Sequence, residues 1–314
     1  SELAAYIGEH WSPDEVALQI MTEPFGNSSA VRWDWQSDRQ ALAVRNVLPE
    51  YTILTSSDQA GNLEKLKEMS PATDENLIYT FTTYEPYTIG WNTAGPGMNG
   101  TIGPQSYFGD IPYPAPQDLT EAEIDELIER LIEKVPDSMK QQGRDYLKPY
   151  FLGIYDTNPI FKNNYDVGYV REWNYKRMES LNKWSEANGG KIHIACVEFG
   201  MMDKTTAIKY YGAAEGTGIS HETRYGFIHD LRDAFERYGI GWVYWHWNGT
   251  FTVFDPETRI FYSDVAPKDL EFCYDGQLIE YSLGLTPKWK EDSSIDYQVG
   301  IEVTRPAKTT YYIG

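Results

Sequence analysis

Two glutamates stand at the ends of apolar runs, where carboxylates can do chemistry. Glu198 lies in the run 192–200, and Glu23 ends the run 16–23 before Pro24. Such runs are typical of buried parallel strands, whose carboxyl ends form the rim that holds catalytic groups. Two carboxylates on one rim are what a glycosidase needs to break a glycosidic bond. The plainer alternative is that each glutamate merely ends its strand.

The composition limits the partners of the chain. Its 314 residues carry a formal net charge of −20, which repels nucleic acid and anionic membranes, so we expect neither as a partner. The sequence has no apolar segment long enough to span a membrane, and no obligate protein partner is evident. Aromatic residues are abundant, with 10 Trp, 24 Tyr and 12 Phe, which suits both sugar stacking and a large aromatic core.

The cysteines and histidines indicate neither a metal nor a cofactor. Cys196 and Cys273 lack metal-ligand spacing, and no two histidines have the H-x-x-x-H spacing of a metal site. Cys196 shares a strand face with Glu198, which predicts a buried free thiol rather than a disulfide. A metal-dependent hydrolase is therefore a distant alternative.

The carboxylates need a sheet to hold them, and the chain supplies alternating strands and helices. The predicted strands are 16–23, 51–56, 77–84, 192–200 and 240–247. The predicted helices are 1–8, 39–48, 62–69, 120–135, 169–187 and 221–238. Because no hairpin signals separate these units, the sheet is predicted to be parallel.

Two aromatic loops are predicted between these elements. A polar loop at 26–37 holds Trp33 and Trp35. A longer loop at 87–118 holds Trp91, and loops of that length in a compact domain are usually functional.

The strand ends, taken in order, resemble glycoside hydrolase family 5, a family of retaining endoglycanases on (β/α)8 barrels. The resemblance runs from about residue 3 to residue 285. The segments that carry it are 4–24, 79–86, 111–114, 197–200, 241–247, 251–255 and 274–285, the last similar to the closing helix of the barrel. The resemblance implies an α/β fold of the TIM-barrel family, with only strands four to eight present in this chain.

The resemblance also implies roles for individual residues. Glu23 would be the general acid/base and Glu198 the nucleophile, with Tyr84 hydrogen-bonded to Glu198 to keep it ionised and oriented. Two substrate-binding positions depart from the family pattern: Thr22 stands where the family has Asn, and Thr82 stands where it has His. Contacts to the sugar 2-hydroxyl strengthen in the transition state, so the change at Thr22 is expected to affect rate or specificity.

Tryptophans are the remaining candidates for substrate binding. The resemblance implies Trp245 as the aromatic floor under the cleaved sugar, with Trp247 as the alternative. Trp91 is a candidate for a substrate subsite from the long loop. For Trp184 we expect core packing instead.

The predicted domain boundaries leave the barrel incomplete. Residues 1–285 would form the C-terminal five-eighths of a barrel, 286–300 a linker, and 301–314 the start of a bacterial Ig-like domain. We expect the chain to be clipped at both ends and inactive on its own. The Ig-like resemblance would place the parent protein outside a bacterial cell, secreted or attached to the surface.

Two functions remain in view, and a polysaccharide is the expected partner in both. The first is a retaining endo-β-glycanase acting on plant-type β-glycans such as cellulose or β-glucan, mannan or xyloglucan. The alternative, motivated by Thr22 and Thr82, is a catalytically impaired barrel that binds polysaccharide at a bacterial cell surface. The presence of both glutamates favours the enzyme.

Overall fold

The described residues cover most of the predicted barrel segment. The computed structural model describes residues 2–25, 33–90, 103–155, 162–202, 204, 207–208, 212–245, 251, 272–274 and 277–279. The predicted linker and the predicted Ig-like segment lie outside these residues.

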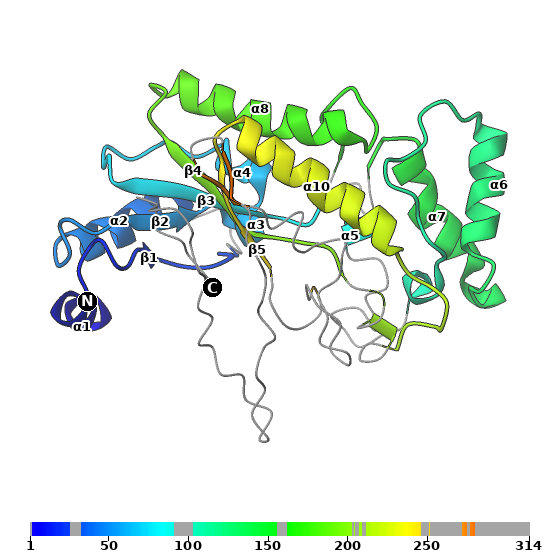
Figure 1. The fold of residues 1–314 in the computed structure, drawn as a ribbon, viewed down its shortest axis with the longest axis horizontal. Coiled ribbons are helices and arrows are strands. Elements are labelled where there is room, and N and C mark those ends of the chain that lie inside the picture. Colours follow the sequence, from blue (N-terminus) through cyan, green and yellow to red (C-terminus); the bar gives the residue numbers. More distant parts are fainter. Residues whose placement is uncertain are drawn as a thin grey trace.

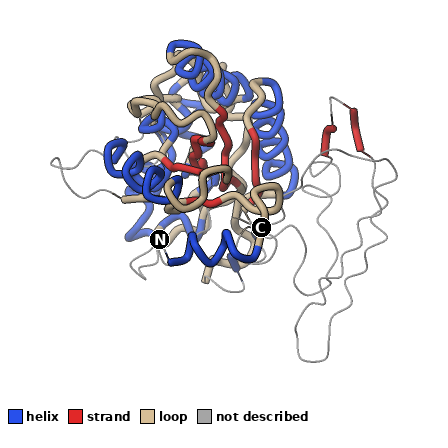
Figure 2. The backbone as a smooth tube through the Cα atoms, turned by 90° about the vertical axis from the view of Figure 1, so that its left-hand side faces the viewer, coloured by secondary structure: helices blue, strands red, loops and turns tan. Residues whose placement is uncertain are grey.

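The fold is organised around five parallel strands that pair in chain order, as predicted. They are β1 (Leu18–Gln19), β2 (Ile53–Ser56), β3 (Leu77–Thr83), β4 (His193–Phe199) and β5 (Gly241–Tyr244). Each strand pairs with the next in parallel, for example Ile53 with Leu77 and Ala195 with Gly241. The strands curl at the centre of the molecule with helices around them (Figure 2). The described part is therefore an open segment of a β/α barrel.

Helices alternate with the strands along the chain. They are α1 (Glu2–His10), α2 (Trp33–Arg45), α3 (Asp58–Gly61), α4 (Leu63–Leu66), α5 (Tyr87–Gly90), α6 (Glu121–Leu131), α7 (Lys140–Phe151), α8 (Arg171–Ala187) and α10 (His221–Arg237), with 3-10 turns at Pro104–Tyr107 and Asp137–Met139. Figure 1 shows α8 and α10 side by side against the sheet, with α6 and α7 beyond them.

Aromatic and aliphatic side chains from α8 and α10 fill the core against the strands. Phe81 of β3 and Phe199 of β4 each pack edge-on against Phe235 of α10. Trp184 of α8 is 8% exposed, and its ring nitrogen donates to the Met69 carbonyl oxygen at 3.3 Å, which confirms its core role.

Several helix boundaries follow the predicted signals. The Thr120 side chain accepts from the Glu123 backbone nitrogen while the Glu123 side chain accepts from Thr120, so α6 begins with the predicted capping box. After α8, Gly189 and Gly190 have φ values of 103° and 71°, a left-handed conformation that favours glycine and ends the helix.

Other boundaries differ from the predictions. The strand predicted at 16–23 pairs only through Leu18 and Gln19, so Glu23 lies in an irregular segment beyond β1. The predicted loop at 26–37 is helical from Trp33 onward, and the Trp33 ring nitrogen donates to the Ser56 carbonyl oxygen at 2.6 Å, which anchors α2 on β2. Helix α7 was not predicted, and it forms although Pro149 lies inside it, a position that proline disfavours.

The prediction of a closing helix at 274–285 is wrong for the residues of this segment that the structure describes, 274 and 277–279. Strands β6 (Phe272–Tyr274) and β7 (Gln277–Ile279) pair antiparallel instead.

Candidate active site

Glu198 lies at the carboxyl end of β4, one residue before the strand ends. Its side chain is half-buried, and the hydroxyl of Tyr84, directly after β3, donates to its Oε2 atom at 3.1 Å. Tyr84 is 6% exposed, so packing holds the donor in place. The thiol of Cys196 is free and buried, as predicted, and it donates to the Glu198 carbonyl oxygen at 3.2 Å. These contacts fix the strand end that presents the carboxylate.

Gly200 allows β5 to approach the end of β4. A Cβ atom at this position would lie 2.4 Å from the Trp245 carbonyl oxygen, so only glycine fits. The Trp245 backbone nitrogen donates to the Phe199 carbonyl oxygen at 2.8 Å. Trp245 is 43% exposed, which leaves an aromatic side chain partly open to solvent next to the strand that carries Glu198.

Glu23 follows β1 in a backbone conformation that is rare for its residue type. Its φ is 47°, in the left-handed region that costs a residue with a Cβ atom about 1–2 kcal/mol. The next residue, Pro24, is buried, and its carbonyl oxygen accepts from the Ala60 backbone nitrogen at 3.0 Å. Thr82, next to last in β3, lies close enough to the Glu23 carboxyl to lower its pKa. Strain held by such neighbours is a common property of functional sites.

The two carboxyl groups lie close enough to influence each other's ionisation. Burial raises the pKa of Glu198, the charge of Glu23 raises it further, and the hydrogen bond from Tyr84 opposes both effects. Glu23 is exposed as a residue, but partial removal of its carboxyl from water raises its pKa, and Thr82 lowers it. Removal from water is the main cause of the shift at both residues, and the repulsion adds to the shift at Glu198.

Tyr84 is kept in its protonated form. Burial raises its pKa, and the charges of Glu198 and Glu23 raise it further. The hydroxyl therefore only donates to Glu198 and does not compete as a base.

A left-handed turn after β2 supports the acid pair, and no sequence signal had identified it. Gln59, Ala60 and Gly61 have φ values of 53°, 59° and 73°. The Ala60 carbonyl oxygen accepts from Thr82 Oγ1 at 2.7 Å, in addition to the Ala60 contact with Pro24. A Cβ atom on Gly61 would lie 3.1 Å from the Thr82 backbone nitrogen. The turn thus links the Glu23 segment to β3.

A third carboxylate, Glu85, lies at the same strand ends and was not predicted as a site residue. It follows β3 and precedes Pro86, the same pattern as Glu23 and Pro24. Its Oε2 atom accepts from Arg177 of α8 at 3.0 Å and from the Thr83 hydroxyl at 2.8 Å. The Glu-Pro pattern could have marked Glu85 as a candidate site residue. Only the fold shows that its partner is Arg177 of α8.

The remaining predicted residues are not all brought together. Thr22 is exposed beside Glu23, and within the described residues its side chain has no hydrogen-bond partner. Trp91 and Trp247 lie outside the described residues. The contacts above therefore join Glu23, Glu198, Thr82 and Tyr84, with Trp245 adjacent to β4.

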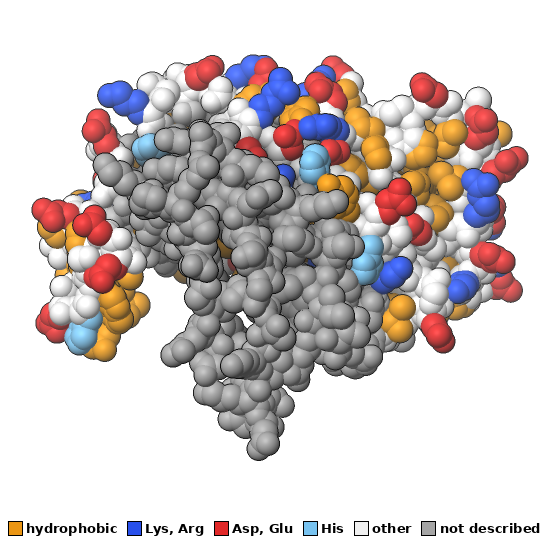
Figure 3. All heavy atoms as spheres, in the orientation of Figure 1, with side chains coloured by type: hydrophobic (Ala, Val, Ile, Leu, Met, Phe, Trp, Pro, Cys, Tyr) orange, Lys and Arg blue, Asp and Glu red, His pale blue; other side chains and the backbone are white. Residues whose placement is uncertain are grey.

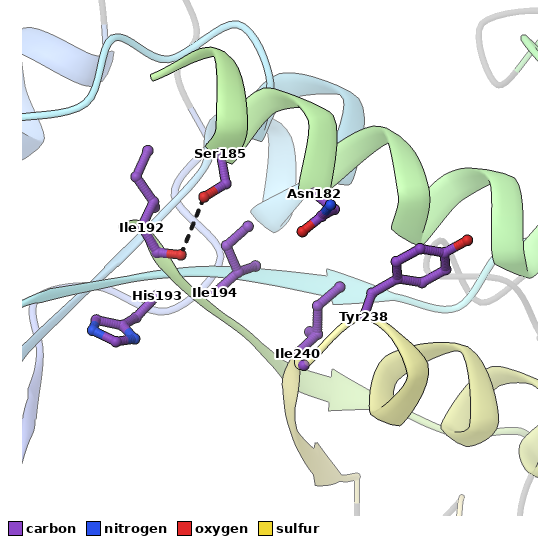
Figure 4. A pocket seen from close by; sticks show the side chains of 8 residues that line it. Asn182, Ser185, Ile192, His193, Ile194, Tyr238 and Ile240 are labelled. Carbon is purple, nitrogen blue, oxygen red and sulfur yellow. Dashed lines mark hydrogen bonds between the residues drawn. The ribbon is translucent and has the colours of Figure 1, made fainter. Parts of the chain in front are cut away.

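A small cavity at the opposite end of β4 does not compete with this site. A cavity of about 80 Å³ lies where β4 begins, the end of the strand opposite Glu198, and includes Ser185, whose hydroxyl donates to the Ile192 carbonyl oxygen at 3.5 Å (Figure 4). That is small beside the roughly 300–1,000 Å³ of ligand pockets. Within the described ranges, no three His, Cys, Asp or Glu side chains are arranged to hold a metal ion.

The described surface carries side chains of both charges on the side in view (Figure 3). Figure 3 shows acidic and basic side chains interspersed over the described helices. No helix among the described residues is both long enough and apolar enough to cross a membrane.

The fold and the site together define a class of protein. It is a β/α-barrel segment that carries two carboxylates at its strand ends, close enough for one to raise the pKa of the other. No known family profile matches the sequence. Endoglucanase 3 of Fibrobacter succinogenes is 23% identical over 258 residues, a match that covers 81% of this chain and 32% of that protein.

Solved structures are similar in fold. Cel5A, an endoglucanase of Thermotoga maritima, has a TM-score of 0.52 at 15% identity, covering 84% of this chain and 62% of that one. Cellulose synthase subunit Z of Clostridioides difficile has a TM-score of 0.53 at 13% identity, covering 84% and 63%. The resemblance to endoglucanase barrels is thereby confirmed. The chain spans about a third of the curated relative and somewhat less than two thirds of these structures.

Proposed function

We propose that this chain contributes the paired glutamates of a retaining endo-β-glycanase that hydrolyses plant-type β-glycans, namely cellulose or β-glucan, mannan or xyloglucan. The observation that carries the proposal is the hydrogen bond from Tyr84 to Glu198, with the charge of Glu23 close enough to raise the Glu198 pKa. The similarity to endoglucanase 3 supports the class of reaction.

Double displacement assigns one role to each carboxyl group. Glu198 attacks the anomeric carbon as a carboxylate while Glu23 gives its proton to the leaving oxygen. Water, deprotonated by Glu23, then breaks the glycosyl ester and restores both groups. The raised pKa of Glu23 suits a group that must begin protonated. The hydrogen bond from Tyr84 favours the charged form of Glu198 that must attack.

The sugar would be held by residues around this pair. Trp245 offers an exposed ring next to β4, and Trp247 and Trp91 remain proposed stacking residues. Thr22 is proposed to meet the sugar from the exposed side of the Glu23 segment. Thr82 is proposed to line the same site beside Glu23, whose pKa it lowers.

A barrel that binds polysaccharide without cleaving it is the second candidate. The observation that favours it is the engagement of the Thr82 hydroxyl with the Ala60 carbonyl oxygen, which leaves this side chain less free to contact substrate. In either case, polymers of this size do not cross membranes, so we propose that the protein acts outside the cell.

An activity screen on β-glucan, mannan, xylan and xyloglucan separates the two candidates. It is carried out with the full-length protein that contains this chain, because the chain spans only part of its relatives. The enzyme is expected to release oligosaccharides whose anomeric configuration, followed by NMR during the first turnovers, is that of the substrate. Binding to one of these polymers without any release would support the binding-only barrel, and an inverted product would contradict the double displacement.

A further inference from the structure

A buried arginine of α10, Arg224, is bound to the strand ends that carry the candidate active site. It lies in the first turn of the helix and is 1% exposed. Its hydrogen bonds to described residues end on the Met201 and Phe251 carbonyl oxygens and on the Tyr244 hydroxyl. Removing a guanidinium from water is costly unless its donors are bonded, so these contacts keep the side chain in place.

The guanidinium group joins the chain beyond β4 to the end of β5 and the chain beyond it. Its Nε atom donates to the Met201 carbonyl oxygen at 3.2 Å. Its Nη2 atom donates to the Tyr244 hydroxyl at 3.0 Å and to the Phe251 carbonyl oxygen at 3.2 Å. The Tyr244 hydroxyl donates to the same carbonyl oxygen at 3.0 Å, so the backbone at Phe251 is held twice. A planar guanidinium suits such a set of acceptors, because its donors point in fixed directions.

The side chain of Phe251 packs against the residue that donates to Glu198. Its ring centroid lies 5.2 Å from that of Tyr84, and Phe251 is 3% exposed. A Cβ atom on Gly200 would lie 3.2 Å from Phe251 Cδ1, so the ring also fits closely against the end of β4. Tyr84 and Phe251 belong to a small hydrophobic cluster that is separate from the main core. The position of the Tyr84 ring therefore depends on Phe251.

Tyr84 in turn influences the ionisation of Glu198. Its hydroxyl donates to Glu198 Oε2 at 3.1 Å, and this bond lowers the Glu198 pKa. A hydrogen bond weakens steeply when its length or angle changes, so a small displacement of the Tyr84 ring is enough to weaken it. The described hydrogen bonds of Arg224 end on the chain around the site and not on the carboxylates, which makes its influence indirect.

We propose that Arg224 is a positioning residue for the candidate active site: it holds Phe251 against Tyr84 and so keeps the Tyr84 hydroxyl on Glu198. The importance of this bond for catalysis rests on the proposed function, in which Glu198 is the nucleophile. Loss of the Arg224 contacts should alter the ionisation of Glu198 and not only the stability of the fold.

The test is a double-mutant cycle in the full-length protein that contains this chain, with Arg224→Lys, Tyr84→Phe and both changes together. Lysine keeps the charge but lacks the fork of donors. Alone, Arg224→Lys should lower kcat/KM on β-glucan by about tenfold, the lower end of the range for a hydrogen bond to a charged group. The acidic limb should move to higher pH, because a weaker bond raises the Glu198 pKa. In the Tyr84→Phe background the same change should cost less than about twofold and move the limb no further.

A second variant and a matched control separate positioning from stability. Phe251→Leu removes the ring that packs against Tyr84 but keeps the backbone carbonyl that binds Arg224, and it should move the acidic limb in the same direction. The control is Arg177→Lys, at an arginine of α8 that is 3% exposed and donates to Thr83 and Glu85. It should lower stability and leave the pH profile unchanged.

A measurement without turnover separates this inference from the proposed function. The Glu198 carboxyl, identified as the carbon-13 NMR signal that Glu198→Gln removes, should titrate at higher pH in both Arg224→Lys and Phe251→Leu. If the shift is found but no glycan is hydrolysed, the positioning role stands and the proposed function fails. An unshifted titration in Phe251→Leu, or an equal loss of kcat/KM from Arg224→Lys with and without the Tyr84 hydroxyl, would overturn the positioning role.

Discussion

The hydroxyl of Tyr84 donates a hydrogen bond of 3.1 Å to Oε2 of Glu198, across the pairing of β3 with β4. These residues are 114 positions apart in the chain. The bond lowers the pKa of Glu198, and the raised pKa of Tyr84 keeps this donor protonated near neutral pH. Several expected outcomes depend on it and on the contacts around Glu23.

Tyr84→Phe should slow catalysis and shift its pH dependence. The hydrogen bond lowers the Glu198 pKa, so its loss raises that pKa, and a smaller fraction of Glu198 is ionised at a given acidic pH. The acidic limb of the kcat/KM profile should move to higher pH. The rate should fall about 10- to 100-fold, from a bond to a charged group of about 1.5–3 kcal/mol. Tyr6→Phe, on the exposed face of α1, is the control and should change neither quantity.

Glu198→Ala and Glu23→Ala should fail in different ways. Removing the nucleophile should abolish turnover, with added azide restoring it as a glycosyl azide of inverted configuration. Removing the acid/base should cost about 10²–10⁴-fold on natural glycans and spare substrates with activated leaving groups. Kinetics on paired substrates with and without azide measure this. Identical behaviour of the two variants would contradict the assigned roles.

Ala60→Gly should stabilise the protein. Ala60 has a φ of 59°, where a Cβ atom costs about 1–2 kcal/mol and glycine is unstrained. After the entropy that glycine loses on folding, the free energy of unfolding should rise by about 0.5–1 kcal/mol. Urea denaturation measures this as a higher midpoint with an unchanged slope. In contrast, Ala43→Gly in α2 should lower stability by a similar amount; stabilisation by both variants would argue against strain at Ala60.

Arg177→Met should destabilise the fold strongly. The Arg177 and Glu85 side chains are 4% and 11% exposed, so the change leaves a buried carboxylate without its cation. Breaking a buried pair costs about 3–5 kcal/mol. Arg144→Met is the matched control, because Arg144 and Glu129 are 37% and 53% exposed and such pairs contribute about 0–1 kcal/mol. Equal losses in the two variants, measured by denaturation, would show that burial is not the cause.

The order of elements was largely determined by the sequence. The capping box at Thr120 and the glycines after α8 are local signals. They, like the apolar runs, mark elements whose boundaries depend mainly on neighbouring residues in the chain. The sequence also marked Glu23 and Glu198 as strand-end carboxylates. It failed where tertiary contacts dominate: at α7, which forms despite Pro149, and at β1, which pairs through only two residues.

Only the tertiary structure decided which carboxylates meet. Glu23-Pro24 and Glu85-Pro86 look alike in the sequence, yet they have different partners. Successive side chains of an extended strand point to opposite faces. At the end of β3, Thr82 and Tyr84 therefore face the Glu23 and Glu198 carboxyls, while Thr83 and Glu85 face Arg177 of α8. No local pattern could specify that division, because it depends on which element packs against each face of the sheet.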